Sequence, residues 1–132
     1  MREFNVDTIR LITSFENITG TEVRDCIKNE CIYFLVGEGK AALAIGKGGQ
    51  TIKNAERAFK RQIKIFEWST NQKDFVKNLV PLAENIVINN DKVTISINNK
   101  NKGIVIGKDG KNINIIRELL KRNSDLKDLK IA

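Results

Sequence analysis

The stretch AIGKGGQTI, residues 44–52, decides the fold, and most of its pattern returns as VIGKDGKNI at residues 105–113. In each stretch an isoleucine precedes a Gly-x-x-Gly turn, a lysine follows the first glycine, and a second isoleucine comes three residues after the last glycine. Gly46 and Gly107 are 61 residues apart, and the same offset aligns Lys60-Arg61 with Lys121-Arg122. Such self-similarity predicts two copies of one module.

The length and composition fit two small modules of a soluble protein. The chain has 132 residues, of which 41% are hydrophobic and 30% are charged, values that are ordinary for a globular protein. A polar stretch at residues 69–72 separates two apolar segments, as expected of a loop between units. The sequence therefore predicts a first module over residues 1–70 and a second over residues 71–132.

Hydrophobic periodicity predicts the same order of elements in both modules: helix, strand, strand, short helix, Gly-x-x-Gly loop, long helix, strand. In the first module we expect a helix from Asp7, strands at 23–28 and 31–36, a short helix at 40–45, a long helix with its buried face from Ile52, and a strand at 63–68. In the second we expect a helix at 74–79, a hairpin, a short helix, a long helix through Arg122 and a strand at 126–131. The predicted fold class is therefore α+β, an α/β sandwich in which each module has a three-stranded sheet with helices packed on one face.

Positive charge gathers around the two glycine motifs. The formal net charge is +7 and the pI is near 9.5. Residues 40–64 contain seven basic residues against one acidic, and residues 100–122 contain seven against two. This distribution is typical of a protein that meets a polyanion.

The residues that most enzyme sites need are missing from the sequence. With no histidine, no Ser-His or Cys-His pair can form, and Cys26 with Cys31 makes an incomplete zinc site. Residues 37–42 fit a loose dinucleotide pattern but lack a full crossover helix, and Gly46-Lys47 lacks the flanking residues of a Walker A loop. The sequence leaves carboxylate chemistry open. We expect a non-catalytic protein with no cofactor, no metal site and no small-molecule substrate.

The sequence predicts no contact with a membrane. The longest apolar run, residues 31–36, is far too short to span a bilayer, and the first seven residues lack the apolar core of a secretory signal. We therefore expect a cytoplasmic protein.

The glycine turns suit a phosphate. Glycine lets a backbone approach a ligand closely, and the amides and dipole of the helix that follows attract an anion. Lys47 and Lys108 add mobile positive charge beside those amides. An apolar floor for unstacked bases could come from Ile45 and Ile52 in one motif and from Ile106 and Ile113 in the other. Core packing explains Ile52 and Ile113 at least equally well, because both lie at helical spacing.

Both motifs resemble the I-G-x-x-G-x-x-I signature of KH domains, whose Gly-x-x-Gly loop clamps about four nucleotides of single-stranded nucleic acid. The helix and strand before each motif resemble the type II arrangement, which implies a mixed sheet. Two such modules in tandem resemble the KH pair of the archaeal NusA-like termination and antitermination proteins. The resemblance implies single-stranded RNA as the partner, and RNA polymerase as a possible second partner. The residues expected to contact RNA are Ile45, Gly46, Lys47, Gly48, Gly49, Ile52, Lys53, Ile106, Gly107, Lys108, Asp109, Gly110, Lys111 and Ile113.

Asp109 departs from a phosphate-binding pattern, because a carboxylate repels a phosphate. We therefore expect the second loop to bind more weakly, or to depend on Lys111. Two alternatives remain open. One is a KH protein of ribosome assembly or RNA processing. The other is a protein-binding scaffold in which the Gly-x-x-Gly loops are structural.

Overall fold

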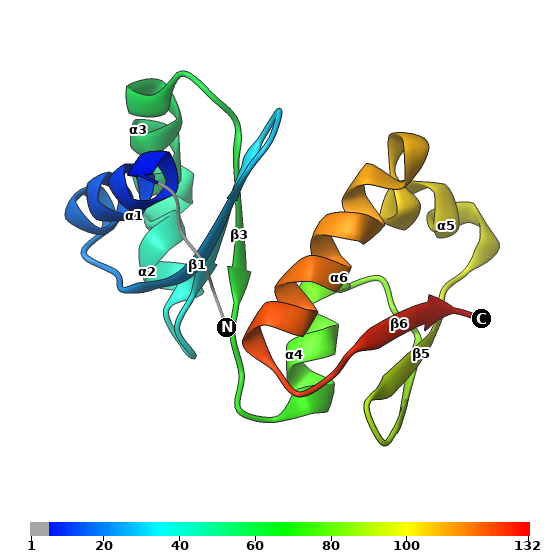
Figure 1. Ribbon diagram of the computed structural model, residues 1–132. Coiled ribbons are helices and arrows are strands. Elements are labelled where there is room, and N and C mark those ends of the chain that lie inside the picture. The colour runs from blue at the N-terminus through cyan, green and yellow to red at the C-terminus, as the bar shows by residue number, and fades with distance from the viewer. Residues whose placement is uncertain (1–5) are drawn as a thin grey trace. The chain divides into compact units, whose positions relative to one another are not determined.

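The computed structural model describes residues 6–132, which form two compact units divided between Ser69 and Thr70 (Figure 1). The expectation that the N-terminus carries no secretory signal rests mainly on residues 1–5, which lie outside the described residues. No helix over residues 6–132 has both the length and the apolar character needed to cross a membrane.

The first unit has the predicted order of elements. Its helices and strands are α1 (Val6–Thr19), β1 (Val23–Lys28), β2 (Ile32–Val36), α2 (Ala41–Ile45), a 3-10 turn (Lys47–Gly49), α3 (Gln50–Phe59) and β3 (Ile63–Glu67). Strand β2 lies in the centre of the sheet, antiparallel to β1 and parallel to β3. The sheet is therefore mixed, as the resemblance to type II modules implies.

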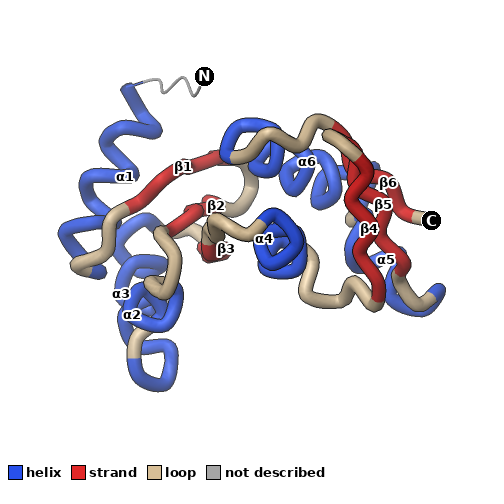
Figure 2. Tube along the Cα trace, turned by 90° about the horizontal axis from the view of Figure 1, so that it is seen from below, coloured by secondary structure: helices blue, strands red, loops and turns tan. Residues whose placement is uncertain are grey.

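The second unit repeats this plan. Its elements are α4 (Gln72–Leu79), β4 (Asn85–Asn89), β5 (Lys92–Ser96), α5 (Asn99–Ile106), a 3-10 turn (Lys108–Gly110), α6 (Lys111–Asn123) and β6 (Asp128–Ile131). Strand β5 is antiparallel to β4 and parallel to β6. In each unit the helices lie to one side of the strands (Figure 2). The predicted α+β fold class, with two three-stranded mixed sheets, is confirmed.

The core of the first unit lies between the sheet and its helices. Alternate residues of β2, Ile32, Phe34 and Val36, are buried in one cluster because successive side chains of a strand point to opposite faces. Phe15 of α1 stacks on Phe34 with ring centroids 3.9 Å apart. Ala55 of α3 is buried in the same cluster, so packing fixes the helix that follows the glycine turn.

Buried apolar residues hold α6 in the same way in the second unit. Ile116 and Leu119 of α6, Val93 of β5 and Leu129 of β6 are all buried. Helices α4 and α5 begin with side-chain caps, since Asn71 accepts the amide of Asp74 and Asn98 accepts the amide of Lys100. Helices α3 and α6 begin differently, directly after the glycine turns.

Candidate nucleic-acid interface

The first glycine of each turn has a conformation that other residues do not adopt. Gly46 has φ 79° and ψ 169°, and Gly107 has φ 76° and ψ 173°. Both values lie in a region of backbone space that is essentially restricted to glycine. Each glycine also ends its short helix, because the amide of Gly46 donates to Ala42 and that of Gly107 donates to Gly103.

The same glycines lie directly against the start of the next helix. A Cβ placed on Gly46 would be 2.8 Å from the backbone nitrogen of Thr51 and in collision with the Thr51 hydroxyl. A Cβ on Gly107 would be 2.7 Å from the Cβ of Asn112. The Asn112 side-chain amide also donates to the carbonyl of Val105 at 2.8 Å, joining α6 to α5 across the turn. The first glycine therefore sets the angle between the two helices.

The middle of each turn is open to solvent. Gly48 and Asp109 occupy equivalent positions, with φ of 62° and 56°. No atom lies within 4 Å of a Cβ placed on Gly48, so a side chain fits there. Aspartate is one of the few residues that enter this left-handed region readily, which explains why the second turn keeps its shape. Its carboxylate is exposed at the position where the first turn carries no side chain.

Helices α3 and α6 both start from a glycine, which has no side chain to cap them. Gly49 and Gly110 are the N-caps, and both are left-handed. Each donates its own amide back to the first glycine of its turn, at 3.0 Å and 3.2 Å. The amides of Gln50 and Lys111 also donate within the turns, to the carbonyls of Lys47 and Lys108. The positive end of each helix dipole, which no side chain caps, is what favours an anion beside the turn.

Exposed lysines surround both helix starts. Lys47 and Lys108 occupy the second position of the turns. Lys53 lies one helical turn further on, and its Cε is 3.9 Å from a Cβ placed on Gly49, so the side chain reaches back toward the loop. In the second unit Lys111 is the first residue of α6, whereas the first unit has Gln50 there.

The four isoleucines of the motifs fall into two groups. Ile45 and Ile106, which precede the first glycines, are 39% and 37% exposed. Ile52 is half-buried and packs against the core of the first unit, and Ile113 is only 4% exposed. Of these four isoleucines, Ile45 and Ile106 are therefore the two that present substantial apolar surface beside the turns.

One further pair of residues was missed by the sequence analysis. Leu43 and Ile104 lie three residues before the first glycines and are 54% and 66% exposed. They are equivalent under the same 61-residue offset that aligns the glycines, which was the only indication available in the sequence. Both units thus expose a second large aliphatic side chain on the short helix that leads into the turn.

The described residues 6–132 contain no group of three or more histidine, cysteine or acidic side chains that could hold a metal ion. Cys26 and Cys31 are free thiols, and Cys26 is buried. The Sγ of Cys31 lies 3.7 Å from the side-chain oxygen of Gln62.

Comparison with known proteins identifies the family. The KH domain profile matches residues 10–80 and again residues 73–131. The "Probable transcription termination protein NusA" of Methanocaldococcus jannaschii is 34% identical over 132 residues, which cover 95% of this chain and 72% of that protein. The protein of the same description from Halococcus morrhuae is 30% identical and covers 94% of both chains.

A solved structure gives the same result. The chain described as "Crystal structure of APE1850" superposes with a TM-score of 0.76 at 33% sequence identity, covering 98% of this chain and 100% of that one. Each of the two profile matches contains one glycine turn with its flanking helices. The protein is therefore a NusA-like member of the KH domain family, and it carries two KH modules in tandem.

Proposed function

We propose that this protein binds single-stranded RNA without catalysing a reaction, and that it serves in transcription termination or antitermination in the cytoplasm. The observation that carries the proposal is the repeated turn. In each copy a glycine in a glycine-only conformation precedes a helix that has no side-chain cap, and an exposed lysine and an exposed isoleucine lie on either side of that glycine. The names of the archaeal relatives support the transcriptional role. RNA polymerase is the second partner that we propose for such a role.

Each turn supplies two kinds of contact. The backbone phosphate of the RNA binds at the helix start, where amides, helix dipole and lysine all favour an anion. The base attached to it rests on the exposed isoleucine before the turn, Ile45 or Ile106. Gly46 to Gly49 and Gly107 to Gly110 hold the phosphate, Lys53 and Lys111 add charge, and Ile52 and Ile113 support the site from the core.

The two modules contribute unequally. Gly48 leaves the first turn purely basic, whereas Asp109 places a carboxylate at the equivalent point of the second. Lys111 offsets that carboxylate in part, because it begins the helix that follows. The first module is therefore the stronger phosphate clamp.

The two turns provide reciprocal variants. Gly48→Asp gives the first turn the aspartate of the second, in a position with space and backbone conformation for it. Asp109→Gly gives the second turn the glycine of the first. We expect Gly48→Asp to lower the affinity for single-stranded RNA about tenfold, the loss of one charge-assisted contact, and Asp109→Gly to raise the affinity. Fluorescence anisotropy with a labelled RNA of mixed sequence measures both.

A matched control separates local repulsion from overall charge. Gly39→Asp adds the same charge at another exposed glycine with positive φ and open space around it. It should change affinity far less than Gly48→Asp. If the two variants weaken binding equally, or if neither has an effect, the loops are not phosphate clamps. The scaffold function, with structural turns, then replaces the proposal.

A further inference from the structure

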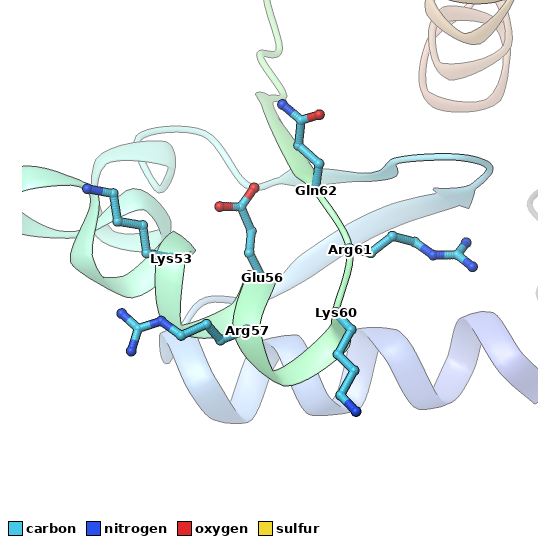
Figure 3. Close-up of a pocket in the computed structure, with 6 residues that line it drawn as sticks. All are labelled: Lys53, Glu56, Arg57, Lys60, Arg61 and Gln62. Carbon is cyan, nitrogen blue, oxygen red and sulfur yellow. The ribbon is translucent and has the colours of Figure 1, made fainter.

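Four basic residues lie along α3 and in the turn that leads to β3. Lys53, Arg57, Lys60 and Arg61, named here the α3 cluster, line a depression together with Glu56 and Gln62 (Figure 3). All four basic residues are exposed. The α3 cluster therefore extends positive surface beyond the glycine turn at the other end of the helix.

The charges of the α3 cluster are not neutralised locally. Among residues 6–132, none of the four side chains forms an ion pair. Glu56 is the only acidic residue of the depression, and its Oε2 accepts the amide of Ile63 at 2.9 Å. Arg61 donates one N–H to the carbonyl of Asn29 at 2.7 Å, a neutral acceptor that leaves the positive charge in place.

The backbone at this turn is unusual. Lys60 ends α3 in the left-handed conformation, with φ 55° and ψ 41°, which glycine or asparagine normally occupies. This conformation costs free energy for a lysine, and such residues are concentrated at functional sites. The equivalent residue of the second unit, Lys121, lies inside α6, which continues to Asn123.

The equivalent face of the second unit is less positive. Asn114 takes the place of Lys53, and Glu118 takes the place of Arg57. Glu118 forms an ion pair with Arg122 at 3.4 Å. Because Arg117 takes the place of Glu56, the five equivalent positions carry a net charge of +2 in the second module against +3 in the first.

We propose that the α3 cluster binds further backbone phosphates of the RNA strand that the first glycine turn holds, so that the first module covers more than the loop's own nucleotides. This proposal rests on the proposed function. Lys53 connects the two sites, because it belongs to the cluster and its Cε lies near Gly49. Residues 53 to 60 extend about 10 Å along the helix, and the forked guanidinium of Arg57 matches the geometry of a phosphate.

Two lengths of oligouridylate distinguish the α3 cluster from the loop. One oligomer is about as long as the four-nucleotide footprint of a Gly-x-x-Gly loop, and the other is about four times longer. The cluster variant is Arg57→Gln/Lys60→Gln, which leaves Lys53 and the turn intact. The control variant, Lys92→Gln/Lys130→Gln, removes the same charge from exposed positions on neighbouring strands β5 and β6. Binding is measured by anisotropy at several salt concentrations.

The cluster variant should bind the short oligomer as the wild type does and bind the long oligomer more weakly than the control variant does. The slope of log affinity against log salt for the long oligomer should become shallower by about 1.4, since each lost phosphate contact accounts for about 0.7. Gly48→Asp should instead weaken the binding of both oligomers.

Other outcomes overturn the proposal. If the cluster and control variants behave alike with the long oligomer, the α3 cluster contributes only general charge. If an acidic peptide such as oligoglutamate binds the wild type but not the cluster variant, while RNA binding is unchanged, the cluster is a docking site for protein. If the cluster variant weakens RNA binding and Gly48→Asp does not, the cluster binds RNA independently and the proposed loop clamp fails. If the wild type binds neither oligomer, both proposals fail.

Discussion

The glycines of the two turns have different roles. Gly46 and Gly107 combine a glycine-only conformation with direct contact between their Cα and the next helix. Gly48 needs only a left-handed conformation, which Asp109 reproduces in the second module. The first glycine is therefore a requirement of the fold, and the middle position is available for tuning the charge of the loop.

This difference predicts unequal costs for the same substitution. Gly46→Ala should destabilise the first module by about 3 kcal/mol or more, because the methyl group meets the backbone of Thr51 and φ stays positive. Gly48→Ala should cost about 1 kcal/mol, the penalty of the left-handed conformation alone. Urea unfolding followed by the fluorescence of Trp68, the single tryptophan, measures both. Equal costs would contradict the assigned roles.

At the scale of residues, the sequence predicted the glycine turns and their lysines but not the exposure of the apolar side chains. The sequence left core packing and base contact open for Ile52 and Ile113, and only the packed structure shows Ile113 buried and Ile106 exposed. Leu43 and Ile104 were missed because exposure depends on which face of a five- or eight-residue helix meets the core. A helix that short has too few residues for periodicity to define a buried face.

At the scale of elements, hydrogen bonds join helices to strands in the first module. In two places a glutamate side chain on a helix accepts a hydrogen bond from the first backbone amide of the next strand in its sheet. Glu16 of α1 accepts the amide of Val23 at 2.9 Å, and Glu56 of α3 accepts the amide of Ile63 at 2.9 Å. The second module replaces Glu56 by Arg117, whose Nε donates to the carbonyl of Leu129 at 3.0 Å. In both modules a side chain of the long helix therefore forms a hydrogen bond with the backbone of the last strand. In the first module the side chain is an acidic acceptor, and in the second it is a basic donor.

Glu56→Ala should therefore destabilise the first module by about 1 to 2 kcal/mol, since it leaves the partly buried amide of Ile63 without its acceptor. Glu56→Gln should cost less, because its side-chain oxygen can still accept the bond. Glu22→Ala, at an exposed glutamate of the same module, is the control, and urea unfolding followed by Trp68 fluorescence is the measurement. A cost for Glu56→Ala no greater than that of Glu22→Ala would show that this hydrogen bond contributes nothing.

The order of the elements was predicted in full, while their bounds moved by a few residues. The last strand was expected at 126–131, but β6 begins at Asp128. The amide of Leu126 instead donates a hydrogen bond to the hydroxyl of Ser124 in the turn before the strand. Helix α3 begins at Gln50, two residues before its first apolar contact at Ile52. Apolar periodicity locates the buried face of a helix or strand, whereas hydrogen bonds at its ends decide where it starts.

For the whole molecule, the charge that attracts RNA should not change near neutral pH. The net charge is +7 and the sequence contains no histidine, the side chain whose ordinary pKa lies in that range. RNA affinity at constant ionic strength should therefore differ by less than about twofold between about pH 6 and about pH 7.5. Anisotropy titrations at the two values test this. A tenfold difference would indicate a titrating group in the interface that these contacts do not include.

Gly48 and Asp109 share one backbone conformation although their side chains differ in charge. A substitution at this position changes what the loop attracts without changing how the loop is built. After a duplication of the module, selection could therefore lower the affinity of one copy while both copies went on folding. The same single position gives the protein engineer separate control over the binding strength of each copy.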